Sequence, residues 1–137
     1  MCQSLMDEDF GRLGGDLQII AAALALFAKS LSPGGEYEKE GARWIYRPND
    51  FVTFQVQPKK RAILLSLRGH RMAFKEKAEN CGFERAWRED LDRGWSLSYS
   101  EYQITNANQL AAAAQFVKWA SEHPWHRRAR SAGRRSP

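Results

Sequence analysis

The chain has 137 residues, of which 43% are hydrophobic and 27% are charged, and its formal net charge is +5. These values are typical of one globular domain that can bury a core without metals or disulfides. The longest apolar stretch, residues 17–28, is too short to cross a bilayer, and acidic residues precede it, which disfavours a signal peptide. Cys2 and Cys81 form no disulfide framework, so we expect a cytoplasmic protein.

The basic excess is confined to the C-terminal end of the chain. Residues 124–137 contain five arginines and no acidic residue. Removing those five from the 21 basic residues leaves 16, which equals the number of acidic residues, so the rest of the chain is neutral. The sequence therefore predicts one folded domain over residues 1–123, followed by a basic tail without regular structure.

The first predicted element is a long helix. Apolar residues step by three and four along one stripe, which consists of Leu13, Leu17, Ile20, Leu24, Phe27 and Leu31. Residues 32–35, Ser-Pro-Gly-Gly, end this helix because proline cannot continue the hydrogen-bond ladder and glycine frees the backbone. A short helix over residues 4–11 is expected to precede it.

Three strands with tight connections are predicted next. Residues 42–47, 51–57 and 61–68 are rich in β-branched and aromatic residues, and the turn formers Pro48-Asn49-Asp50 and Pro58-Lys59-Lys60 separate them. Alternation within the second and third of these segments places their apolar side chains on one face. The arrangement is an antiparallel meander.

The second half of the chain adds one strand and one helix. Residues 69–94 are compatible with helix but are interrupted by glycines. Residues 95–104 alternate between large apolar residues and serines, which predicts a fourth strand. Thr105 or Asn106 then caps a helix that runs to about Glu122. The order α-βββ-α-β-α predicts an α+β fold, in which an antiparallel sheet of about four strands packs on the N- and C-terminal helices.

Three segments carry a resemblance to a known family: LFAKSL (26–31), WIYRPNDFVTFQVQPKKRAILLSLR (44–68), and Gly94-Trp95 with LSYSEYQITNANQLAAAAQFVKWASE (97–122). Their order resembles a bacterial family of unknown function labelled "predicted transport protein". Its members stand alone or at the C-terminal end of proteins similar to restriction or DNA-modification factors. The resemblance covers roughly residues 17–122, and residues 69–83 and the basic tail depart from it. It implies an α+β fold and a link to DNA-directed systems, and it supplies no catalytic residue.

Catalytic and metal-binding patterns are incomplete in this sequence. Asp50, Gln55 and Gln57 have the spacing of a metal-dependent nuclease, but amides replace the carboxylate and the lysine that Mg²⁺ and water require. His123 and His126 lack the third and fourth ligands of a zinc site. Three alternating carboxylates are typical of a solvated loop or an edge strand: Glu36, Glu38 and Glu40. The sequence therefore predicts a non-enzymatic domain without catalytic residues, metal or cofactor.

Nucleic-acid binding is the first predicted function. One face of the sheet packs on the helices, and the outer face carries either Trp44 and Tyr46 or Arg43 and Arg47. Aromatic rings flanked by cations are typical of surfaces that bind single strands, and an arginine-rich tail neutralises phosphates. The predicted contacts are Arg43, Trp44, Tyr46, Arg47, Lys59, Lys60, Arg61, Arg127, Arg128 and Arg130.

The alternative function is a module that binds a small molecule or a protein. Uncharged donors and acceptors on the outer face would form its surface, and the expected residues are Thr53, Gln55, Gln57, Ser96, Ser98 and Tyr102. A solvent-exposed sheet face that carries scattered apolar residues also permits a homodimer. A third interpretation is that the aromatic residues are core and the sheet simply has one solvated face.

Overall fold

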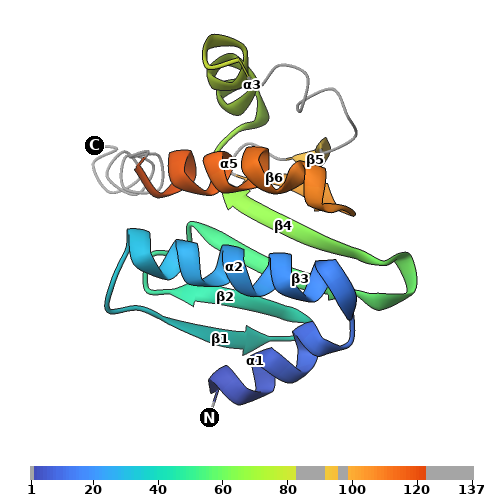
Figure 1. Cartoon of the computed structure of the whole chain (residues 1–137). Helices are drawn as coiled ribbons and strands as arrows, with labels where there is room; N and C mark the ends of the chain where they lie inside the picture. Colours follow the sequence, from blue (N-terminus) through green and yellow to red (C-terminus); the bar gives the residue numbers. More distant parts are fainter. Residues whose placement is uncertain (1, 83–91, 96–98, 123–137) are drawn as a thin grey trace.

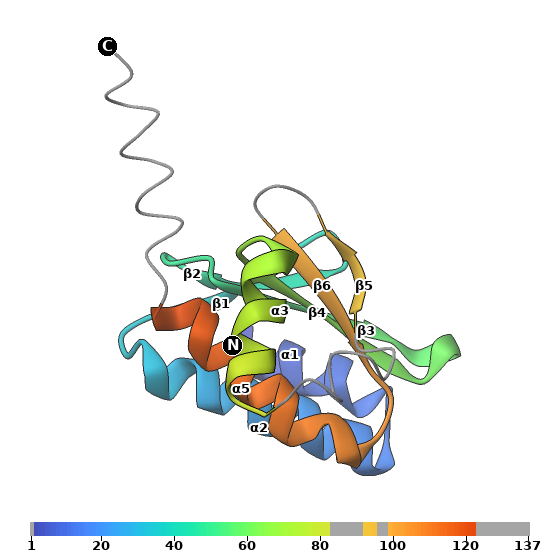
Figure 2. The ribbon, with the colours of Figure 1, turned by 90° about the horizontal axis from the view of Figure 1, so that it is seen from above.

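Helices cover one face of an antiparallel sheet in this computed structural model (Figures 1 and 2). The structure describes residues 2–82, 92–95 and 99–122, with the backbone alone for residues 2–4 and 92–95. In chain order the elements are α1 (Cys2–Gly11), α2 (Gly15–Leu31), β1 (Glu36–Glu40), β2 (Arg43–Arg47), β3 (Val52–Gln57), η1 (Pro58–Lys60), β4 (Ala62–Arg68), α3 (Arg71–Asn80), β5 (Asp92–Trp95), β6 (Tyr99–Ile104), η3 (Ala107–Gln109) and α5 (Leu110–Glu122).

The sheet has the strand order β1-β2-β3-β4-β6-β5, and every neighbouring pair is antiparallel. The predicted α+β class is therefore confirmed, but the sheet has six strands rather than about four. The acidic segment 36–40 is the edge strand β1. Residues 95–104 do not form one strand, because β5 ends at Trp95 and β6 begins at Tyr99 and pairs back onto it.

The face of the sheet that packs on the helices is apolar. Trp44 and Tyr46 of β2, Phe54 of β3, Leu65 of β4 and Tyr102 of β6 are all at most 1% exposed. Residues two apart on a strand share a face, so each strand presents this face with every second side chain. Burying one such side chain contributes about 1.5–3 kcal/mol, and α2 and α5 provide the opposite wall (Figure 2).

The turn between α2 and β1 is fixed by one tyrosine. The Tyr46 hydroxyl donates to the carbonyl oxygen of Ser32 and accepts from the backbone N–H of Gly35, at 3.2 Å. Gly35 lies so close to β2 that an added Cβ would be 2.5 Å from the carbonyl oxygen of Arg47. Glycine is therefore required here for close approach of two backbone segments.

Helices α3 and α5 meet over Tyr102 of β6. Phe74 of α3 contacts the rings of Tyr102 and Phe116, with 5.9 Å between centroids in both pairs. Asn106 caps the 3₁₀ turn η3 through a reciprocal capping box with Gln109, and α5 continues from it to Glu122, as predicted. In the described part of the chain, no helix is long and apolar enough to span a bilayer.

Candidate functional site

A row of paired residues crosses the face of the sheet that the helices leave open. Ile45 pairs with Thr53, Thr53 with Ser66, and Ser66 with Glu101. Directly opposed residues of antiparallel strands point to the same side, so these four side chains form one continuous floor. Thr53 and Ser66 are each only 8% exposed although they lie on the open face. Longer side chains around them therefore shield two hydroxyl groups.

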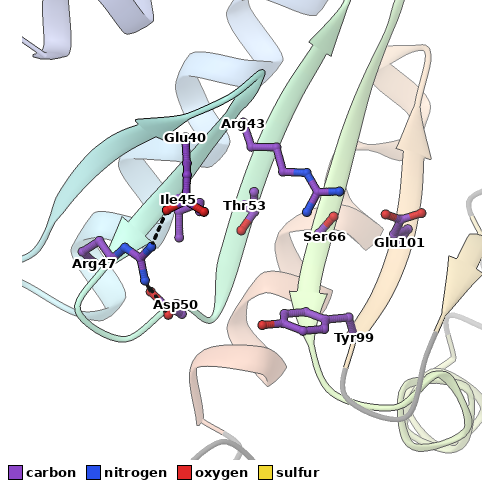
Figure 3. A pocket seen from close by; sticks show the side chains of 9 residues that line it. All are labelled: Glu40, Arg43, Ile45, Arg47, Asp50, Thr53, Ser66, Tyr99 and Glu101. Carbon is purple, nitrogen blue, oxygen red and sulfur yellow. Dashed lines mark hydrogen bonds and ion pairs between the residues drawn. The ribbon is translucent and has the colours of Figure 1, made fainter.

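Those longer side chains enclose a hollow of about 490 Å³ (Figure 3). It is lined by Glu40, Arg43, Ile45, Arg47, Asp50, Thr53, Ser66, Tyr99 and Glu101. A volume of this size falls within the range of about 300–1,000 Å³ that small-molecule sites occupy. The lining includes three carboxylates, two guanidinium groups and two aliphatic hydroxyls, so it is polar and close to electrically neutral.

Arg47 is held by carboxylates at one wall of the hollow. Its guanidinium nitrogens lie 2.8 Å from Asp50, 3.0 Å from Glu40 and 3.6 Å from Glu38. The negative charge of Asp50, and less strongly those of Glu40 and Glu38, raises the pKa of Arg47. Exposed ion pairs of this kind add little stability. They nevertheless occupy the guanidinium donors of Arg47, so this side chain is less able to bind an anionic ligand.

Tyr99 and Arg68 lie at the same end of the hollow as Asp50. The Arg68 guanidinium donates to the Tyr99 hydroxyl at 3.2 Å and lies 5.3 Å from the centroid of the Tyr99 ring. Its Nη2 is also 3.9 Å from Oδ2 of Asp50. Tyr99 is 41% exposed, and its ring is presented along the rim of the hollow (Figure 3). The aromatic ring of Tyr99 therefore borders the polar floor.

Arg43 and Glu101 come from different strands, β2 and β6. Figure 3 shows the Arg43 side chain reaching across the sheet to Ser66, with the Glu101 carboxylate beyond it. In the part of the chain that the structure describes, neither side chain forms a hydrogen bond or an ion pair. Arg43 is exposed and Glu101 is half-buried. The hollow thus holds one uncommitted positive group and one uncommitted negative group.

The prediction that Trp44 and Tyr46 lie on the open face of the sheet and contact nucleic acid is wrong. Trp44 and Tyr46 are 1% and 0% exposed on the helix-covered face, so neither ring can stack on a base. The period of two along β2 then places Arg43, Ile45 and Arg47 on the open face. The sequence left both orientations open for this strand. The core interpretation of its aromatic residues is the correct one.

Tyr102 is a second correction. The alternation predicted it on the open face, but it is 0% exposed and packs against Phe116 at 4.9 Å between ring centroids. Ser100 also faces inward and donates to the carbonyl oxygen of Gly69 at 2.7 Å. Tyr99, by contrast, lines the hollow on the open face. The error arose because one continuous strand was assumed where the chain forms a hairpin.

The other predicted residues divide into three groups. Gln55 and Gln57 lie on the open face with Thr53, as expected, and Gln57 accepts from Gln103 at 3.3 Å. The basic turn residues Lys59, Lys60 and Arg61 are exposed beside the end of β3. The remaining predicted residues lie outside the described part of the chain: Ser96, Ser98, Arg127, Arg128 and Arg130.

Several of the lining residues could not be recognised as site residues from the sequence. Asp50 and Glu40 were interpreted as turn and edge residues, and Ser66 and Glu101 were not linked to each other. A signal was present in the alternation of β4, because any register that buries Leu65 and Leu67 turns Ser66 outward. Glu101 would have required the register between β4 and β6, which no local pattern specifies.

Metal ligands do not cluster within the described residues. There, no group of three or more His, Cys, Asp or Glu side chains is arranged to hold a metal ion. His70 instead caps α3, where its Nδ1 accepts from the backbone N–H of Met72 at 3.1 Å. His123 and His126 lie beyond the described residues. The expected absence of a cofactor stays a prediction.

A second, more apolar hollow lies beside α1 and α2. It measures about 330 Å³, and it is lined by Asp7, Phe10, Ala22, Ala25, Leu26, Lys29 and Tyr37. Leu26 and the neighbouring Ile19 are 66% and 68% exposed on α2. This groove has fewer polar groups than the sheet hollow and offers less basis for specific recognition.

Comparisons with known proteins give no assignment. No family model, curated protein or solved structure matches this chain significantly. The resemblance to the "predicted transport protein" family therefore stays a prediction. Any function for this chain must be argued from the geometry of its own residues.

Proposed function

We propose that this domain is a non-enzymatic binding module whose sheet hollow holds one small polar molecule. The observation that carries this proposal is the floor of Thr53 and Ser66. Two hydroxyls that are shielded by surrounding side chains can form directional hydrogen bonds to a ligand that displaces water. The uncommitted charges of Arg43 and Glu101 then supply orientation.

The charge balance of the hollow disfavours nucleic acid at this surface. Among the described lining residues, three carboxylates outnumber two guanidinium groups, and Arg47 is already engaged by acidic side chains. A phosphate backbone requires an excess of positive charge, which it recruits by releasing counterions. The burial of Trp44 and Tyr46 also removes the stacking surface that single strands use. Nucleic-acid binding would then depend on the basic turn and the tail.

The lining also favours binding over nucleophilic catalysis. Among the residues that the structure describes, the lining contains a serine and a threonine but no histidine, cysteine or lysine. A hydroxyl nucleophile needs a positioned base to accept its proton, and histidine fills this role most often. The arrangement of groups therefore supports recognition of a ligand.

A thermal-shift screen tests the proposal. Small polar metabolites of varied charge are compared with single- and double-stranded DNA at low and high salt. We expect a saturable increase in Tm with a small molecule, since a ligand at 100 times its Kd stabilises the folded state by about 2.7 kcal/mol. The variant Ser66→Leu, which fills the floor, should abolish the shift, and Gln55→Leu on the same face outside the lining should not.

Two outcomes would overturn the proposal. The first is DNA binding with a steep salt dependence that Lys59→Gln and Lys60→Gln weaken, together with no effect of any small molecule. The second is an increase in Tm with a small molecule that is as large in the folded Ser66→Leu variant as in the natural protein. The circular dichroism spectrum and unfolding cooperativity of Ser66→Leu establish that it is folded.

A further inference from the structure

We infer that the ligand of the sheet hollow is a small zwitterion of the α-amino-acid type, with its carboxylate on Arg43 and its ammonium group on Glu101. This inference rests on the proposed function, since it names the chemical class of the molecule that the same hollow binds. It follows from which charged groups of the lining are already paired and which are not.

Among the described lining residues, Arg43 is the cation that has no carboxylate partner, so it is the one that can bind an anionic group of the ligand. The other lining guanidinium, on Arg47, contacts Glu38, Glu40 and Asp50. Arg43 has no such contact among the described residues, and its side chain reaches over the floor (Figure 3). A guanidinium group matches the geometry of a carboxylate with two parallel hydrogen bonds. A carboxylate is therefore the group that fits this end.

Glu101 is the lining carboxylate that is left for a cationic group. Asp50 and Glu40 both lie within 3.0 Å of Arg47 nitrogens. Glu101 is half-buried and pairs with Ser66 in the register of β4 and β6, and its carboxylate has no hydrogen-bond partner in the described residues. A half-buried carboxylate gains most from a cation that it meets away from bulk water. A primary ammonium group fits, because it brings a compact charge and three donors.

The two charged groups exclude ligands that carry only one sign of charge. An anion on Arg43 would face Glu101 beyond Ser66, and a cation on Glu101 would face Arg43 (Figure 3). A zwitterion satisfies both groups and leaves the site neutral. Its remaining donors and acceptors lie above the hydroxyls of Thr53 and Ser66, and a side chain directed along the hollow meets the ring of Tyr99.

Matched ligands and variants test this inference by calorimetric titration of the full chain. The probes are the common L-α-amino acids, the C-terminal amide of the best one, and its N-acetyl derivative. We expect each derivative to bind about tenfold more weakly or worse, because a polar site rejects a ligand that leaves its groups unpaired. Arg43→Gln should remove the preference for the acid over the amide, and Glu101→Gln the preference for the amine over the N-acetyl form.

Control variants separate local from general charge effects. Arg61→Gln and Glu122→Gln make the same changes at exposed positions outside the hollow, and both should retain the preferences. The inference is overturned if the amide and N-acetyl forms bind as well as the amino acid, or if only anions or neutral molecules bind. In those cases the proposed function is still supported if Ser66→Leu abolishes the binding that is observed. If Ser66→Leu leaves the binding of every probe unchanged, both the inference and the proposed function fail.

Discussion

Trp44 of β2 donates a hydrogen bond from its indole Nε1 to Oδ2 of Asp9 in α1, at 2.9 Å. The contact joins the first helix to the second strand, and it satisfies the one polar atom of an indole that is 1% exposed. Arg12 donates to the other carboxylate oxygen of Asp9 at 3.2 Å. A buried tryptophan normally finds such a partner, and this one explains why its ring turns toward the helices.

Removing the indole donor should destabilise the fold. Trp44→Phe keeps most of the apolar area but leaves the Asp9 carboxylate without this donor, so we expect a loss of about 1–3 kcal/mol in the free energy of unfolding. Urea denaturation measures this loss. Asp9→Asn is the control, because its amide oxygen can still accept from the indole and the cost should be smaller. Equal stability of Trp44→Phe and the natural protein would contradict the account.

Adding a methyl group at Gly35 should strain the junction of α2 and β1. The new Cβ would lie 2.5 Å from the Arg47 carbonyl oxygen and 2.6 Å from Cζ of Tyr46. Overpacking against backbone costs about 1–3 kcal/mol or more, so Gly35→Ala should lower Tm by several degrees. Gly11→Ala serves as the control, since its Cβ would meet only the Gln18 side chain, at 3.7 Å. A Gly35→Ala protein as stable as Gly11→Ala would refute the close approach.

Tyr37 should link stability to alkaline pH. Burial, with a further contribution from Tyr46, raises the pKa of Tyr37 well above its ordinary value of 10.0, and its hydroxyl donates to the Ala25 carbonyl at 2.7 Å. Because the raised pKa belongs to the folded state, the stabilisation is complete below pH 10 and is lost as the pH rises above it. Tyr37→Phe should flatten the decline in unfolding free energy above pH 10. An unchanged slope would contradict this assignment.

Asp50 should stabilise one wall of the hollow by its charge. Its backbone φ is +57°, which asparagine tolerates, so Asp50→Asn removes the charge without adding backbone strain. Loss of the contacts to Arg47 and Arg68 should cost about 0.2–1 kcal/mol at low salt, and the difference should shrink at 1 M salt. Thermal melts at the two salt concentrations measure it, with Glu36→Gln as the control. A cost that does not depend on salt would indicate lost packing instead.

The alternation in β3 and β4 was sufficient to predict their buried faces, because Phe54 and Val56 alternate with glutamines in β3 and because Ile63, Leu65 and Leu67 share one face of β4. In β2 both faces are plausible, since Trp44 and Tyr46 alternate with two arginines and an isoleucine. The deciding contacts are with Asp9 and Ser32, which are distant in sequence. Local periodicity contains no information about such partners, so the orientation of β2 could not be derived.

The hairpin of β5 and β6 shows a second limit of periodicity. A period of two continues through residues 95–104 although they belong to two strands, β5 and β6, that pair antiparallel. The inward positions of β6 are Ser100, Tyr102 and Ile104, because its pairing with β4 sets the register. The hollow itself depends on this register, since it brings Glu101 beside Ser66. The sequence shows which charged residues are present, but it does not show which of them lie close together in the hollow.

NMR can show which residues the bound ligand contacts. Amide chemical shifts of the labelled full chain are followed while the tightest-binding amino acid is added. The account predicts the largest changes on the open face of the sheet, at Ile45, Thr53, Ser66 and Glu101. Changes concentrated instead at Ala22 and Leu26 of the groove beside α1, or at residues 59–61 of the basic turn, would contradict it.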